Sequence, residues 1–195
     1  MFSLTHSLIL ASQSPRREQI LTMLGFEFSI VPSGVDEEIP PGLAAEQVPE
    51  ALAQAKALHI SREHPDALVL GADTLVMLDD RILGKPSTAA EALEMLRFLR
   101  SRTHRVYTGV ALALAGNITG SATDCSEVTF ATWGDVELED YIRSGEPMDK
   151  AGAYAIQGRG AFLVDGLQGC FFNVMGLPVQ RTLSLLAPYR AGGSA

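Results

Sequence analysis

A short apolar run that ends in a polar turn is the feature that most constrains the fold. Residues 8–11 are Leu-Ile-Leu-Ala, and residues 12–15 are Ser-Gln-Ser-Pro. Such a run is typical of a strand buried on both faces of an α/β sheet. Ser14 is a suitable N-cap, and Pro15 suits the first helical position because its missing N–H costs nothing there. The sequence therefore predicts a strand, a turn and a helix that ends at Gly25.

Strand and helix patterns alternate along the rest of the chain, which predicts an α/β fold. Residues 71–74 are expected at the C-terminal end of a short buried strand, and residues 115–117 are expected to turn a long antiparallel hairpin. One domain is expected over residues 1–190, with two lobes, followed by a flexible tail at residues 191–195. Further helices are predicted at 49–62, 88–99, 136–143 and 178–186, and further strands at 26–30, 67–70, 75–78, 106–114, 127–133, 161–164 and 171–175.

Composition excludes several classes of function. The chain has 195 residues, 47% of them hydrophobic, and a net charge of -8, which disfavours a polymer nucleic acid as partner. Two cysteines, Cys125 and Cys170, give neither a disulfide framework nor a zinc site, and we expect both to be buried free thiols. The apolar run at residues 8–11 is too short for a membrane span or a signal segment. We therefore expect a cytoplasmic protein with no membrane partner.

The turn at residues 12–17 has the composition of an anion site. It places hydroxyl groups and the guanidinium groups of Arg16 and Arg17 at the start of a helix, where free backbone N–H groups attract phosphate. The alternative is that both arginines are solvated surface charges. Phosphate binding is the interpretation that we favour.

Carboxylates and lysines elsewhere in the chain extend this pattern. Asp73 follows a buried strand, at the place where open α/β sheets bind ligands, although an Asp that only caps a turn is an equal alternative. An acidic loop at 36–38 is weaker evidence, and Lys56 and Lys85 taken singly resemble surface lysines. Together these groups suit phosphoryl chemistry on a polyphosphate. The chain has no GxxxxGK[ST] or GxGxxG motif, and its four histidines lack ligand spacing.

A further irregular stretch at residues 149–158 is predicted to be a binding loop. Gln157 carries both a hydrogen-bond donor and an acceptor, so it can recognise the edge of a base. Tyr154 either packs against a ring of the ligand or anchors the loop.

These motifs resemble those of the Maf family of nucleoside triphosphate pyrophosphatases over nearly the whole chain. The resemblance implies an α/β fold with a long mixed β-sheet, flanking helices and a central cleft, similar to inosine triphosphate pyrophosphatases. It also implies cleavage of a nucleoside triphosphate to the monophosphate and pyrophosphate with a divalent cation, Mg or Mn. The residues that carry it are 10–17, 35–37, 71–74, 84–86, 108–110, 149–154, 156–158 and 173–178.

The same resemblance assigns roles to individual residues. Asp73 matches the catalytic proton acceptor, and Glu37 with Asp73 matches the metal ligands. Arg16, Thr74 and Gln157 match the branch of the family that acts on dTTP and UTP. Residue 155 is Ala where the family usually has Gly, and residues 170–171 are Cys-Phe where a polar residue and Tyr are usual. The phosphate-binding residues implied are Ser12, Ser14, Arg16, Arg17, Lys56 and Lys85.

Other functions remain open at this point. The family is also linked to septum formation and cell-division arrest, which a nucleotide-binding regulator without catalysis would serve. A house-cleaning pyrophosphatase for a purine nucleotide or for 7-methyl-GTP is another alternative. The retained carboxylates and lysine favour turnover, since a pure binder could dispense with the carboxylates. The sequence leaves the oligomeric state open, with a homodimer as one possibility.

Overall fold

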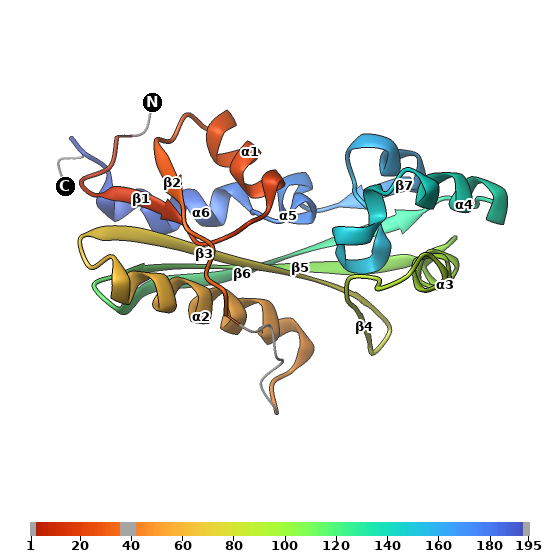
Figure 1. The fold of residues 1–195 in the computed structure, drawn as a ribbon, viewed down its shortest axis with the longest axis horizontal. Coiled ribbons are helices and arrows are strands. Elements are labelled where there is room, and N and C mark those ends of the chain that lie inside the picture. Colours follow the sequence, from red (N-terminus) through yellow and green to blue (C-terminus); the bar gives the residue numbers. More distant parts are fainter. Residues whose placement is uncertain (1–2, 36–41, 193–195) are drawn as a thin grey trace. The chain divides into compact units, whose positions relative to one another are not determined.

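The structure, a computed structural model, describes residues 3–35 and 42–192. Within these residues the strands form one sheet in the order β2-β1-β3-β5-β6-β7, with β4 paired to β3 (Figure 1). The pairs β1–β2 and β1–β3 are parallel, whereas β3–β4 and β6–β7 are antiparallel. The predicted α/β class with a mixed sheet is therefore confirmed.

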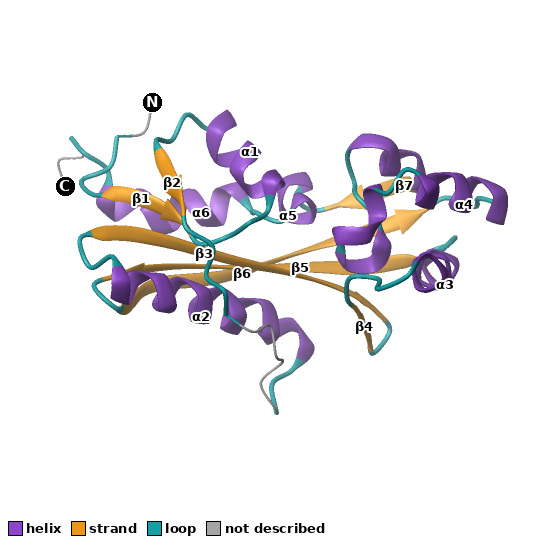
Figure 2. Ribbon diagram, in the orientation of Figure 1, coloured by secondary structure: helices purple, strands orange, loops and turns teal. Residues whose placement is uncertain are grey.

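Helices precede or follow most of the strands, as Figure 2 shows. The strands are β1 (Ser7–Leu10), β2 (Phe28–Ile30), β3 (Ala67–Leu78), β4 (Arg81–Leu83), β5 (Thr103–Leu114), β6 (Asn117–Phe130) and β7 (Val164–Gln168). The helices are α1 (Pro15–Met23), α2 (Val48–Glu63), α3 (Ala89–Leu99), α4 (Asp135–Arg143), α5 (Phe171–Met175) and α6 (Val179–Leu186).

The chain divides into two compact units. Unit 1 comprises Met1–Asp73, Thr108–Asp124 and Gly176–Ala195, and unit 2 comprises Thr74–Tyr107 and Cys125–Met175. Strands β3, β5 and β6 each contribute residues to both units. The prediction of one domain over residues 1–190 stays a prediction.

Unit 1 is built around the close approach of α2 to β3 and β5. A Cβ added to Gly71 would lie 2.9 Å from the backbone nitrogen of Ala57 and closer still to the carbonyl oxygen of Ala53. A Cβ on Gly109 of β5 would meet the backbone of α2 in the same way. Small residues fill the contact, because any larger side chain would push the helix away. The core here consists of Ile9, Ala11, Ala53, Ala57, Ile60, Ala67, Val69, Ala111 and Ala113.

Unit 2 has its own core, in which three aromatic rings meet edge to face. The ring centroids of Phe130 and Tyr154 are 4.7 Å apart, and His104 lies 5.0 Å from the first and 5.2 Å from the second. Helices α3 and α4 pack against each other in the same unit. Trp133 donates its indole N–H to the carbonyl of Phe162 at 2.9 Å. These contacts tie the segment after α4 to β5 and β6.

Most predicted elements are confirmed, but two predicted strands are wrong. Residues Gly158–Leu163 form a 3₁₀ helix, and Phe171–Met175 form the helix α5. Aromatic and apolar content favoured strands in both segments. In Phe171–Met175, tertiary hydrogen bonds favour the helix instead. There the buried amide of Asn173 donates to the carbonyl of Val106 and to the hydroxyl of Ser126, both at 2.9 Å. Residues 165–166, which lie between the two strands predicted at 161–164 and 171–175, are part of β7.

Strand β3 is also longer than predicted. Residues 71–74 do not end the strand but lie in the middle of its 12 residues. Gly71 serves the close packing of α2 on β3. The predicted hairpin turn between β5 and β6 is confirmed, with Ala115 at φ 50° and Gly116 at φ 74°.

The prediction of buried thiols is wrong. Cys125 is exposed and Cys170 is half-buried, and neither of these two described cysteines is part of a disulfide. Cys125 lies in the part of β6 where most side chains are only partly covered, so strand position did not imply burial. Among the helices that the structure describes, none is both long and apolar enough to span a membrane.

Candidate functional site

The carboxyl ends of the parallel strands bring two predicted site segments to one edge in unit 1. Leu10 of β1 is the register partner of Leu70 of β3, and the Ala11 N–H donates to the Leu70 carbonyl at 2.9 Å. Ser12 follows Leu10 by two residues, and Asp73 follows Leu70 by three. Strand β1 ends there, whereas β3 continues to Leu78. Asp73 therefore lies where the parallel pairing stops, which is where α/β folds commonly bind ligands.

Lys56 and Asp73 form a buried ion pair at this edge. The Lys56 Nζ lies 2.6 Å from the Asp73 Oδ1, and the two residues are 6% and 9% exposed. Lys56 comes from α2 and Asp73 from β3, so the close packing of the helix at Gly71 brings the charges together. Lys56 is thus not the surface lysine that it resembles in the sequence. Buried charges are costly unless paired, so a retained pair is a candidate for function.

The turn before α1 is organised by Arg17. Its Nη1 donates to the Ser12 hydroxyl at 2.9 Å, and its Nε donates to the Gly176 carbonyl at 2.8 Å. Arg17 is 9% exposed, so it is not a solvated surface charge. The bond to Gly176 connects two motifs that lie 159 residues apart in the sequence. Arg17 therefore holds the turn in shape.

Ser14 and Arg16 behave differently from Arg17. Ser14 occupies the predicted N-cap position of α1, but its side chain makes no capping hydrogen bond. Its backbone N–H donates instead to the hydroxyl of Ser12 at 3.2 Å. The prediction of a side-chain cap at Ser14 is therefore wrong, and it is the hydroxyl of Ser12 that accepts hydrogen bonds in this turn. Arg16 is half-buried at the second position of the helix.

Unit 2 carries the other three predicted site residues, Thr74, Lys85 and Gln157. Contacts of the loop at residues 149–158 connect the segments that contain them. The Gly152 N–H donates to the carbonyl of Gly84, the residue before Lys85, at 3.0 Å. A Cβ on Gly152 would lie 3.1 Å from Val76. Val76 shares a face of β3 with Thr74, because strand residues two apart point to the same side. The loop of residues 149–158 therefore packs on the Thr74 face of β3.

Tyr154 anchors this loop and does not offer its ring to a ligand. The side chain is 5% exposed, and its hydroxyl lies 2.7 Å from the His104 Nε2. Burial lowers the pKa of His104 to about 4 and raises the pKa of Tyr154, so both are neutral at pH 7. The anchoring alternative therefore holds for Tyr154. Gln157 is half-buried three residues further on.

The sequence did not reveal Glu146 and Tyr141, which hold the same loop. The Glu146 carboxylate accepts hydrogen bonds from the backbone N–H groups of Arg159 and Gly160. Neither residue belongs to a motif with recognisable chemistry. The glycines at 158 and 160 were the available signal, since each marks a place where the backbone passes close to another group.

The predicted metal ligand Glu37 lies outside the described residues. Within residues 3–35 and 42–192, no three His, Cys, Asp or Glu side chains gather as a metal-ligand group. Mg²⁺ usually takes one or two protein carboxylates and completes its shell with phosphate oxygens and water. The carboxylate of Asp73 fits such a site, which draws most of its ligands from the substrate.

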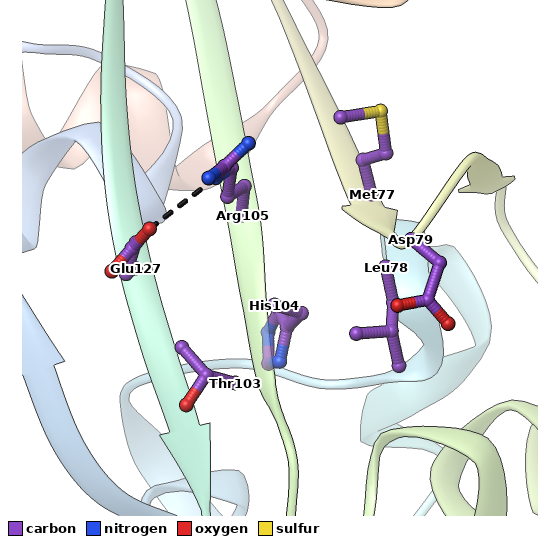
Figure 3. A pocket seen from close by; sticks show the side chains of 7 residues that line it. All are labelled: Met77, Leu78, Asp79, Thr103, His104, Arg105 and Glu127. Atoms are coloured by element: carbon purple, nitrogen blue, oxygen red, sulfur yellow. Dashed lines mark hydrogen bonds and ion pairs between the residues drawn. The ribbon is translucent and has the colours of Figure 1, made fainter.

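A hollow of about 480 Å³ in unit 2 does not coincide with these residues (Figure 3). The ion pair of Arg105 Nε with Glu127 Oε1, at 3.3 Å, joins β5 to β6 beside it. Figure 3 marks that pair with a dashed line between the two neighbouring strands. None of the predicted site residues lines this hollow, which is formed by Met77, Leu78, Asp79, Thr103, His104, Arg105 and Glu127.

Comparisons with known proteins agree on one family. Residues 7–189 match the model of the family described as Maf-like protein. A dTTP/UTP pyrophosphatase of Moorella thermoacetica is 50% identical over 181 residues, covering 92% of this chain and 93% of that protein. A protein of the same name from Halalkalibacterium halodurans is 45% identical over 179 residues, covering 92% and 94%.

Solved structures give a weaker likeness. A HAM1 protein from Coxiella burnetii has a TM-score of 0.49 at 15% identity, covering 94% of this chain and 99% of that chain. A nucleoside-triphosphatase, or dITP/XTP pyrophosphatase, from Mycobacterium abscessus has a TM-score of 0.45 at 16% identity, covering 93% and 95%. The family match and the curated relatives are sufficient, and they show that the chain belongs to the Maf-like protein family.

Proposed function

We propose that the protein is a nucleoside triphosphate pyrophosphatase that hydrolyses dTTP and UTP to the monophosphate and pyrophosphate. The observation that carries the proposal is the buried Lys56–Asp73 pair, beside the turn that Arg17 organises at the end of β1. The names of relatives that are 45–50% identical over nine-tenths of the chain support the same reaction and substrates.

In this proposal Asp73 orients and helps to deprotonate the attacking water. Lys56 fixes the carboxylate through the 2.6 Å contact, so little reorganisation is needed when the water binds. Ser12, Ser14 and Arg16 bind phosphate oxygens at the start of α1, where the helix dipole favours negative charge. Arg17 keeps that turn in place, and Lys85 offsets charge on the departing pyrophosphate.

A divalent cation completes the proposed site. Asp73 and Glu37 would hold Mg²⁺ or Mn²⁺, which when bound supplies charge neutralisation on the phosphates and lowers the pKa of water. A carboxylate is a weak base toward free water at pH 7, so this help is needed. EDTA is therefore expected to abolish hydrolysis, and added Mg²⁺ or Mn²⁺ to restore it. Full activity in chelator would remove the cation from the proposal.

Base selection is assigned to Thr74, Gln157 and Arg16. Uracil and thymine present the same O2, N3–H and O4 edge, which one amide can meet with a donor and an acceptor. Cytosine reverses the groups at N3 and C4, so the same amide would be wrongly paired. A wrongly paired buried amide costs about 1 to 3 kcal/mol, so we expect at least a roughly tenfold preference for UTP over CTP in kcat/KM.

The experiment is a panel of dTTP, UTP, CTP, GTP and ITP with Mg²⁺, with products identified by ³¹P NMR. Monophosphate and pyrophosphate from dTTP and UTP, with slower turnover of the others, is the expected result. Release of inorganic phosphate would place the cleavage at the wrong bond and refute the proposed reaction. Faster turnover of ITP or GTP would favour a purine house-cleaning enzyme, and binding without turnover would favour a regulator.

A further inference from the structure

Glu146 and Tyr141 form a clamp on the loop that carries Gln157. Glu146 Oε1 accepts from the Gly160 N–H at 2.9 Å and from the Tyr141 hydroxyl at 3.0 Å. Glu146 Oε2 accepts from the Arg159 N–H at 3.1 Å. The Tyr141 oxygen in turn accepts from the Ala155 N–H at 3.1 Å. One carboxylate and one phenol thus bind three backbone N–H groups, of Ala155 within the loop and of Arg159 and Gly160 just after it.

These bonds bracket Gln157 on both sides. Ala155 is held two residues before it, and Arg159 is held two residues after it. Gln157 itself has an extended backbone, with φ -110° and ψ 174°. The amide side chain is therefore carried on a span of five residues with both ends fixed, so its direction depends on the clamp.

The glycines of this loop fit around the clamp. Gly158 has φ +68°, and a Cβ there would lie 2.8 Å from Glu146 Oε2. A Cβ on Gly160 would lie 2.6 Å from the Tyr141 hydroxyl. Any side chain at either position would displace the clamp. The contacts with Glu146 and Tyr141 thus explain why residues 158 and 160, shortly after Gln157, are glycines.

The charge states of the clamp suit its hydrogen bonds. Partial burial acts to raise the pKa of Glu146. The hydrogen bonds from the Gly160 and Arg159 N–H groups and from the Tyr141 hydroxyl outweigh the effect of burial, so the pKa of Glu146 lies below its ordinary value. Burial raises the pKa of Tyr141. At pH 7 the carboxylate is therefore an acceptor only, and the phenol keeps the proton that it donates to Glu146.

We propose that Glu146, acting through Tyr141 and the loop backbone, is a positioning residue that sets the base discrimination of Gln157. The proposal rests on the proposed function, because it assumes a pyrimidine triphosphate at the site. An amide distinguishes uracil from cytosine only while its donor and acceptor point in fixed directions. A loosened loop lets the amide rotate and accept either base edge. Losing the clamp should therefore lower discrimination more than turnover.

The test compares Glu146→Gln with Glu139→Gln, an exposed glutamate on α4. In Glu146→Gln the UTP-to-CTP ratio of kcat/KM should fall at least about fivefold, with kcat for UTP changed less than about threefold. Amide hydrogen exchange at Ala155, Arg159 and Gly160 should become faster, independently of activity. Glu139→Gln should match the wild type in every measurement. Tyr141→Phe, which removes the bonds to Ala155 and to Glu146 but leaves the bonds of Glu146 to Arg159 and Gly160, provides a second variant if Glu146→Gln does not fold.

Four outcomes distinguish the proposed role of Glu146 from the proposed function. A lower ratio together with faster exchange supports the proposal. An unchanged ratio in a variant whose loop exchanges faster overturns it, as does an equal loss of kcat on UTP and CTP with no change in their ratio. A wild-type protein that hydrolyses no pyrimidine triphosphate refutes the proposed function, and the assigned specificity role with it, whatever the exchange data show about the clamp.

Discussion

Replacing Gly71 by alanine should disturb the fold and the candidate site together. The added Cβ would lie 2.9 Å from the Ala57 nitrogen and closer to the Ala53 oxygen, whereas real Cβ contacts are essentially never under 3.0 Å. Both neighbours are backbone atoms of α2, so no side chain can rotate away. The helix must therefore move by on the order of 1 Å, an overpacking that typically costs about 1–3 kcal/mol.

The same movement carries Lys56 away from Asp73, because Lys56 lies on α2 between the two clashing turns. A displacement of about 1 Å can cost on the order of 100-fold in rate when catalytic groups must be aligned. We therefore expect kcat for UTP to fall by about 10- to 100-fold, and the free energy of unfolding to fall by about 1–3 kcal/mol.

Urea unfolding followed by circular dichroism, and pyrophosphate release from UTP, measure the two effects. Gly166→Ala is the matched control, since that strand glycine has only ordinary contacts, with Thr129 at 3.7 Å and beyond. It should keep wild-type activity and change stability by less than about 1 kcal/mol. A Gly71→Ala protein as stable and active as Gly166→Ala would refute the account of how α2 delivers Lys56.

Two further predictions concern stability. Because burial lowers the pKa of His104 from 6.5 to about 4, acid favours the unfolded state, which binds the proton more readily. The free energy of unfolding should therefore fall as the pH drops from about 6.5 toward 4. Between pH 7 and pH 5, His104→Gln should lose about 2 kcal/mol less of this free energy than the wild type does. Equal losses in the two proteins would contradict a buried neutral imidazole at His104. Thr88 accepts the Glu91 N–H at 3.1 Å as the N-cap of α3, so Thr88→Ala should lower the free energy of unfolding by about 1 kcal/mol without affecting UTP turnover. An unchanged urea midpoint would show that this cap contributes little.

Local signals predicted the elements whose structure is decided locally. The apolar run before the Ser-Gln-Ser-Pro turn predicted β1 and α1. The helix predicted at residues 88–99 is α3, and Thr88 is its N-cap. The segment Phe171–Met175 failed because its helix depends on the bonds of Asn173 to β5 and β6, which the local sequence does not encode.

The candidate site was only partly predictable for the same reason. Asp73, Lys56 and Arg17 could be predicted as site residues, because a charged residue that follows an apolar run or lies in a recognisable motif indicates a functional role. The arrangement of these residues could not be predicted, since the Lys56–Asp73 pair depends on how closely α2 approaches β3. Glu146 was missed because its role is to bind backbone N–H groups, and nothing in its own sequence neighbourhood marks that role.

The central claim, that Asp73 is the catalytic carboxylate, is tested most directly by the kcat of Asp73→Asn on UTP with Mg²⁺. The substitution keeps the side-chain volume and removes the charge beside Lys56. Asp80→Asn, at an exposed aspartate in the turn after β3, is the control, and circular dichroism checks that both variants fold. We expect Asp73→Asn to lose at least about 1000-fold in kcat and Asp80→Asn to keep the wild-type rate. A folded Asp73→Asn protein that retains more than about one-tenth of the wild-type rate, a change under about 1.4 kcal/mol in the barrier, would contradict it.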